Sequence, residues 1–344
     1  MNKRKIYALS YFLSRSFFLG YGYSVILSNT NKDSWICFIL GTLIGICFIY
    51  AISKIKEKML KLTIKEYLNN HKILKYLILT IFFLFNIFMM SQLLFVLETF
   101  AASFFLINSP TFFILLPILF LLFRITVKGW STIGRIAEIF IPISLVIVIF
   151  SIAILTPYGT TDKFLPIMTQ NNLDMIVTTF MFAFYTSAPF LLLLNVPMQD
   201  HKLIRKYLFG TITIVLIGIL IIAVLGPNLI QIYRYPEYMI LKKIKVFQFL
   251  EKIENIISIT WILDVFITLS VIANNIRLTI PKQKNTLLFT IILTFLFFFV
   301  IYLGEIYFLQ LQIYAIFPII LGGFEILLIL LFFLKNLFKK RSQN

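Results

Sequence analysis

The sequence has little charge, few cysteines and few histidines. Charged residues make up 13% of its 344 residues, and there are two cysteines and two histidines. Soluble domains carry about a quarter charged residues, so this chain has too little charge to cover a surface that faces water. The scarcity of charge argues against a soluble enzyme and against a soluble nucleic-acid-binding protein.

The cysteines and histidines do not form a recognisable disulfide, metal or active-site pattern. Cys37 and Cys47 lie ten residues apart on one predicted helix, and a helix rises about 1.5 Å per residue, so the two thiols cannot meet. His71 and His201 lie in predicted loops without a ligand-spaced partner, and the sequence has no phosphate-binding Walker loop. We therefore expect no enzyme activity, no metal and no cofactor.

Long apolar runs are abundant. Hydrophobic residues make up 60% of the chain, including 39 phenylalanines, and many fall in blocks of about 20, the length that crosses a bilayer as a helix. We predict an all-α integral membrane protein, a single polytopic domain over residues 1–344 with ten transmembrane helices. The helices are expected near Tyr7–Ser28, Trp35–Ile52, Leu74–Phe100, Thr111–Phe123, Arg135–Leu155, Leu173–Leu194, Lys206–Leu225, Glu254–Ala273, Leu287–Leu303 and Leu309–Leu334.

Membrane topology accounts for the net charge of +17. Ten helices place both termini on one side of the membrane. If that side is the cytoplasm, most of the 31 lysines and arginines fall in cytoplasmic segments, which is the positive-inside pattern. We therefore predict cytoplasmic termini and no nucleic-acid partner.

Two connections between the predicted helices are long and amphipathic: residues 53–75, on the cytoplasmic side, and residues 227–252, on the outer side. They become equivalent after a shift of five helices, and because five is odd they fall on opposite faces of the membrane. This spacing favours an inverted 5+5 repeat of the LeuT type, with halves at residues 1–155 and 173–334. The basic segment Ile55–Leu68 can lie on lipid or against a partner, and the sequence does not choose.

The first and sixth predicted helices contain residues that interrupt helices. Gly20 and Gly22 lie in the first, and each costs about 1 kcal/mol of helix stability relative to Ala. Pro189 lies in the sixth and removes a backbone hydrogen bond. Broken helices at these positions would expose backbone groups that bind a zwitterion or an ion. The alternative is close helix packing at glycine and an ordinary proline kink.

Four charged residues lie deep inside predicted helices, where charge is costly. Arg15 is about eight residues into the first helix and needs a carboxylate partner. Glu98, Asp264 and Glu325 are the candidates, and the sequence does not choose among them. For Glu98 and Glu325, a functional role and a structural ion pair are equally open.

Several short motifs, in their order along the chain, resemble the endospore germination permeases. These are the B subunits of nutrient germinant receptors, in the amino acid/polyamine/organocation transporter superfamily. One group of motifs consists of Tyr235-Pro236, Leu241-Lys242-Lys243-Ile244, Phe249-Leu250-Glu251-Lys252-Ile253-Glu254 and Trp261. The others are Gly129, Arg135-Ile136-Ala137-Glu138, Pro142, Phe164-Leu165-Pro166, and Glu98 with Ser109-Pro110.

Three details qualify the resemblance. Arg135 and Glu138 also have the spacing of an ion pair within one helix. The run Tyr185-Thr186-Ser187-Ala188 stands where family members commonly have a Gly–Glu pair, and Arg15 is not a family feature. The charge preference of the ligand therefore does not carry over from the family.

The resemblance implies a receptor subunit that binds a small nutrient, such as an amino acid, within the membrane and triggers spore germination. Its expected location is the spore inner membrane or cytoplasmic membrane, and its expected partners are an A-type membrane subunit and a C-type lipoprotein subunit. The ligand pocket is expected between the first, third, sixth and eighth helices. Its predicted residues are Gly20, Tyr21, Gly22, Glu98, Tyr185, Thr186 and Ser187, with Arg15, Asp264 and Glu325 as intramembrane charges.

Two other functions stay open. One is an amino acid–cation symporter of the same superfamily, with Glu98 or Glu325 as the proton carrier. The other is a membrane scaffold without ligand binding, in which the family motifs serve assembly. The residues with which we associate assembly are Arg135, Glu138, Pro236, Glu254 and Trp261.

Overall fold

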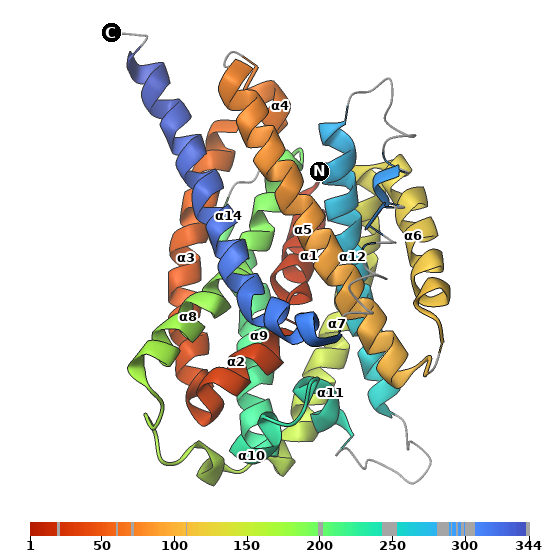
Figure 1. Ribbon diagram of the computed structural model, residues 1–344, viewed down its shortest axis with the longest axis vertical. Coiled ribbons are helices and arrows are strands. Elements are labelled where there is room, and N and C mark those ends of the chain that lie inside the picture. Colours follow the sequence, from red (N-terminus) through yellow and green to blue (C-terminus); the bar gives the residue numbers. More distant parts are fainter. Residues whose placement is uncertain are drawn as a thin grey trace.

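The computed structural model is a bundle of helices (Figure 1). It describes residues 1–18, 21–59, 61–69, 72–107, 109–198, 202–242, 253–280 and 307–341, with the helical positions 289, 291–293, 295–296 and 299. Within these residues, eight segments are long and apolar enough to cross a membrane, and the protein is therefore a multi-pass membrane protein. The segments are Tyr21–Met59, Lys72–Phe104, Thr111–Lys128, Trp130–Tyr158, Asn172–Asn195, Ile204–Leu225, Ser258–Thr279 and Ile316–Lys335.

The described elements are all helical. The long helices are α3 (Ser34–Met59), α5 (Lys72–Phe104), α6 (Thr111–Lys128), α7 (Trp130–Leu155), α8 (Asn172–Ser187), α9 (Ile204–Leu225), α12 (Ile253–Thr279) and α14 (Tyr307–Arg341). The shorter α-helices are α1 (Lys3–Ser16), α2 (Tyr21–Thr30), α4 (Ile64–Tyr67), α10 (Pro227–Ile230) and α11 (Pro236–Leu241). The 3-10 segments are η1 (Asn31–Asp33), η2 (Thr156–Tyr158), η3 (Thr161–Phe164) and η4 (Ala188–Asn195).

Eight of the predicted spans are confirmed as apolar helices, and the first is not a single helix. The predicted ninth span, Leu287–Leu303, lies mostly outside the described residues. Gly20, His71, His201 and residues 243–252 of the second long loop also lie outside them. The ten-helix inverted repeat therefore stays a prediction. Cys37 and Cys47 are free thiols, as their spacing predicted.

Regular α-helix is interrupted at both predicted positions. The first predicted span consists of α1, which ends at Ser16, and α2, which begins at Tyr21. Gly22 lies inside α2, where a Cβ atom would be 3.0 Å from the carbonyl oxygen of Phe17, so glycine lets the two helices approach closely. In the sixth predicted span, α8 changes to 3-10 helix at Ala188, next to Pro189, which cannot donate the hydrogen bond that continues an α-helix.

The two long loops lie at opposite ends of the bundle, with α4 at the top of Figure 1 and α10 and α11 at the bottom. The α4 loop packs against its own chain. The backbone N–H of Ile64 donates to Asn195 Oδ1 at 3.0 Å, and Lys335 Nζ of α14 donates to the carbonyl of Tyr67. Of the apolar residues of the segment, Ile55 and Met59 are buried within the protein, whereas Leu62 is 45% exposed. The chain itself therefore covers the part of the apolar face that Ile55 and Met59 form.

Glycines allow α3 to lie directly against α8 and α9. A Cβ atom on Gly41 would be 2.7 Å from the carbonyl oxygen of Thr179, and one on Gly45 would overlap the hydroxyl of Tyr207. Gly210 of α9 likewise leaves space for Ser14 of α1. Small residues at such contacts are the usual means by which membrane helices pack closely.

We predict that Gly41→Val lowers the stability of the protein by about 1–3 kcal/mol, the usual cost of an overpacked contact. The neighbouring carbonyl belongs to the backbone of α8 and cannot rotate away. The measurement is thermal unfolding of the purified protein in detergent. Gly323→Val is the matched control, because a Cβ atom there meets nothing within 4 Å. Equal melting temperatures for the two variants would contradict the packing role of Gly41.

Candidate functional site

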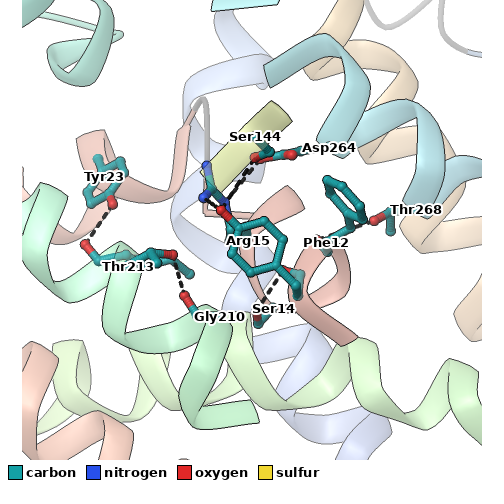
Figure 2. A network of polar contacts seen from close by, with 11 residues as sticks. Phe12, Ser14, Arg15, Tyr23, Ser144, Gly210, Thr213, Asp264 and Thr268 are labelled. Carbon is teal, nitrogen blue, oxygen red and sulfur yellow. Dashed lines mark hydrogen bonds and ion pairs between the residues drawn. The ribbon is translucent and has the colours of Figure 1, made fainter. Parts of the chain in front are cut away.

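The centre of the site is a buried ion pair between α1 and α12. Arg15 Nε donates to Asp264 Oδ2 at 3.1 Å, and the two side chains are 3% and 0% exposed. Figure 2 shows the Arg15 side chain directed at Asp264 and Ser144. Of the three carboxylates that the sequence offered as partners for Arg15, Asp264 is the one that pairs with it. The pair is consistent with the high cost of an unneutralised charge within a membrane.

The same arginine links α1 to α7 through Tyr11. Arg15 Nη1 donates to the Tyr11 hydroxyl, which lies 3.3 Å from Ser144 Oγ of α7. The guanidinium carbon also lies 4.7 Å from the centroid of the Tyr11 ring. Tyr11 and Arg15 are four residues apart and therefore share one face of α1. Three helices are thus held together at a single buried charge.

A cavity of about 60 Å³ lies next to Arg15, between α7, α9, α11 and α12. A water molecule needs about 10–15 Å³ measured in this way, so the cavity can hold several waters or one small organic molecule. Most of its wall is aliphatic, and the polar side chains that line it include Arg15, Glu237, Ser258 and Thr260. An arginine, a glutamate and a few hydroxyl groups in a mostly aliphatic wall suit a small ligand with both charged and apolar parts.

The helix α11 forms one wall of this cavity and is held by an aromatic group that we call the α11 cluster: Phe100, Phe104, Tyr235, Tyr238 and Trp261. The ring centroids of Phe100 and Trp261 are 4.3 Å apart, and those of Phe104 and Tyr238 are 4.1 Å apart. Burial raises the pKa of the Tyr235 hydroxyl, which donates to Thr99 Oγ1 at 3.0 Å. The cluster joins α11 to α5 and α12.

The residues predicted to line the ligand pocket contact different parts of the bundle. The guanidinium carbon of Arg234 lies 4.4 Å from the centroid of the Tyr21 ring. Tyr185 is buried with its ring centroid 5.8 Å from that of Phe317. Gly22 packs against the end of α1, as described above.

The polar side chains of the predicted pocket are engaged by three different helices. Thr186 Oγ1 lies 2.8 Å from the Tyr207 hydroxyl of α9, and Ser187 Oγ donates to Glu325 Oε2 of α14 at 2.8 Å. Glu98 Oε1 accepts from Thr111 Oγ1, at the start of α6, at 2.9 Å. The residues singled out from the sequence that line the cavity beside α11 are Arg15, Trp261 and Leu241, the last from the family motif that begins at Leu241.

The five residues that we associate with assembly differ in their burial and contacts. Pro236 and Trp261 are buried in the protein, where Pro236 begins α11. Glu254, in the first turn of α12, is partly exposed. Arg135 and Glu138, whose spacing permits an ion pair within one helix, do not form one in the described chain. In the described part of the chain the ion pairs are Arg15–Asp264 and Lys54–Glu57.

Sequence reasoning missed Glu237, Ser258 and Thr260, which line the cavity. Glu237 lies in the second long connection and directly follows Pro236 in a motif that resembles the family, and this position is the signal that could have found it. Ser258 and Thr260 are common residues in membrane helices and gave no signal of their own. Tyr11 could have been found, because it precedes Arg15 by one helical turn.

We predict that Arg15→Met and Asp264→Asn each lower stability by about 3–5 kcal/mol, the cost of leaving one partner of a buried pair uncompensated. The double variant should recover most of this loss, because neither charge then remains. Thermal unfolding of the four proteins in detergent measures the effect. A double variant as unstable as the sum of the two single variants would contradict the pairing.

The exposed pair Lys54–Glu57 is the control, with side chains 48% and 52% exposed. Exposed pairs contribute about 0–1 kcal/mol. Lys54→Met should therefore melt close to the unaltered protein.

Two comparisons with known proteins bear on this site. A family model described as spore germination protein matches residues 11–307. YfkT of Bacillus subtilis (strain 168), which is named for spore germination, is 25% identical over 259 residues, covering 69% of this chain and 67% of YfkT. The family match spans α1 to the start of α14 and therefore includes Arg15, Asp264 and every residue named above as lining the cavity. This chain belongs to the spore germination protein family.

Proposed function

We propose that this chain is the permease-like subunit of a nutrient germinant receptor, and that it binds a small nutrient with a carboxylate group, such as an amino acid. The observation that carries the proposal is the cavity beside Arg15, in which a buried arginine and Glu237 share a mostly aliphatic wall. Family membership supports the role in germination. The cavity supports binding next to α11, while the predicted pocket residues Thr186 and Ser187 are engaged with α9 and α14.

The chemistry of Arg15 suits a carboxylate ligand. A guanidinium has five N–H donors, and the two bonds described for Arg15 go to Asp264 and Tyr11. The remaining donors can bind a ligand carboxylate through charge-assisted hydrogen bonds. Glu237 would accept a hydrogen bond from an ammonium group on the same ligand, and the aliphatic wall would contact its side chain.

Binding would act on the partner subunits through the helices that surround the cavity. A ligand changes a conformational equilibrium only by binding one packing more tightly than another. Here it would favour the arrangement in which α11, α12 and α7 close around it. We propose an A-type membrane subunit and a C-type lipoprotein as the partners that respond to this arrangement.

We propose the spore inner membrane or cytoplasmic membrane as the location, with cytoplasmic termini. The distribution of lysine and arginine supports this orientation. The N-terminus and the end of α14 lie in the upper part of Figure 1, toward α4 and away from α11. The cavity would then lie nearer the outer face, from which a germinant arrives.

The experiment is a thermal-shift screen of the purified protein against the twenty amino acids. A ligand that binds the folded state stabilises it by mass action, by about 2.7 kcal/mol at one hundred times its Kd. We expect a stabilising amino acid whose effect is lost when its carboxylate is replaced by an amide. Val148→Phe, in the cavity wall, should abolish the shift by filling the space.

Val146→Phe is the matched control. Val146 lies on the same helix, is 66% exposed on the outside of the bundle and should leave the shift unchanged. A shift that survives Val148→Phe would place the ligand elsewhere, and the absence of any shift in a sample that also contains the A-type and C-type subunits would favour a scaffold. Accumulation of the ligand in sealed vesicles would instead indicate a symporter.

A further inference from the structure

Glu325 is a buried carboxyl group without a cationic partner. It lies in the apolar segment Ile316–Lys335 of α14 and is 0% exposed. Ser187 Oγ donates to its Oε2 atom at 2.8 Å, whereas Oε1 has no hydrogen-bond partner among the described residues. No lysine, arginine or histidine of the described chain forms an ion pair with it. It differs in this respect from Asp264, which is equally buried and has Arg15.

Glu325 faces the point at which the sixth predicted span changes its helix type. Ser187 is the last residue of α8, and η4 begins at the next residue. Gly322, one turn before Glu325, lies directly against the ring of Phe184, where a Cβ atom would overlap the ring. The helices α14 and α8 are therefore in close contact at Gly322, one turn from the carboxyl group, and at the carboxyl group itself.

The helix ends nearby do not neutralise this charge. The helix η4 continues α8 without a gap, and the backbone N–H of Ala188 is already bonded to the carbonyl of Phe184. The free end of η4 is at its other terminus, where Lys56 Nζ donates to the carbonyl of Leu194 at 2.7 Å. At about 2.0 Å per residue of 3-10 helix, Leu194 lies about 14 Å along the chain from Ser187.

The elements packed against α14 are α2, α3, α5, α8 and η4. Their charged side chains contact other groups or are exposed: Lys56 at Leu194, Lys75 at Asn69, Glu98 at Thr111, the pair Lys54–Glu57, and the exposed Lys58, Lys72 and Asp174. The titratable group that interacts electrostatically with Glu325 is the Tyr207 hydroxyl of α9, which lies 2.8 Å from Thr186 Oγ1. None of these groups supplies a positive charge to Glu325.

We propose that Glu325 is a proton-binding site that couples its protonation to the packing of α14 against the junction of α8 and η4. An ionised carboxylate without a cation is strongly disfavoured in an apolar interior, whereas a neutral carboxyl group can accept from Ser187 and stay buried. When α14 separates from the junction and water enters, the carboxyl group becomes a carboxylate and its proton passes to water. The ligand of this site is thus a proton, independent of the nutrient cavity.

The direction of the pH effect follows from this linkage. The packed state holds a proton that the separated state releases, so packing is favoured as pH falls and weakened as pH rises. Glu325→Gln keeps the shape of the protonated group and cannot titrate. Its melting temperature should therefore lack the decrease with rising pH that Glu325 causes in the unaltered protein.

Infrared difference spectroscopy of the purified protein during a pH titration provides the direct test. We expect a carbonyl stretch of a protonated carboxyl group at neutral pH that is lost in Glu325→Gln. It should be retained in Glu57→Gln, whose side chain is exposed. A spectrum of Glu325→Gln identical to that of the unaltered protein would show that Glu325 neither gains nor loses a proton over the titration and would overturn the proposal.

If Glu325→Gln does not fold, Ser187→Ala tests the same site. This variant removes the hydrogen bond to Oε2 and leaves the carboxyl group in place. The proposal predicts that the carboxyl band persists at a shifted frequency. An unshifted band would mean that the protonated group is not the one that faces Ser187, and would equally overturn the proposal.

Discussion

The cost of burying charge in an apolar interior is the constraint on which the rest of this structure depends. Arg15 lies in the middle of the bundle, and a single carboxylate, Asp264, neutralises it at 3.1 Å. Because the two residues belong to α1 and α12, their pairing fixes how these helices face each other. Tyr11 then extends the contact to Ser144 of α7. The cavity lies beside this charge, between α7, α9, α11 and α12.

The interruption of the sixth predicted span imposes a second constraint. Backbone groups that are not bonded within an α-helix need other hydrogen-bond partners in a membrane. The chain supplies them from distant elements. Lys56 donates to the carbonyl of Leu194, and the amide of Asn275 donates to that of Leu192 at 3.0 Å. Asn195 in turn accepts from the α4 loop, so this loop, α12 and α3 all meet at η4. Hydrogen bonds to η4 thus join the α4 loop, at one end of the bundle, to α3 and α12.

The two proposed binding functions use different parts of this arrangement. The nutrient cavity draws on Arg15 and on Glu237 of α11. The proton site draws on Glu325 of α14 and Ser187 at the end of α8. The buried helix α1 contacts α7, α8, α9, α12 and η4, and it therefore joins the two parts physically. A subunit that responds to both a nutrient and a proton would need such a shared element.

The sequence by itself determined the features that depend on local composition. Apolar runs determine where helices cross the membrane, because an apolar helix forms its backbone hydrogen bonds within itself and exposes only apolar side chains to lipid. Pro189 determines where α8 changes to 3-10 helix, and the first span is divided between Ser16 and Tyr21, next to Gly22. The tertiary structure alone decided which carboxylate pairs with Arg15, because Asp264 is 249 residues away and three acids were equally suitable by depth. It also decided which polar residues face a cavity, because that depends on how separate helices rotate against one another.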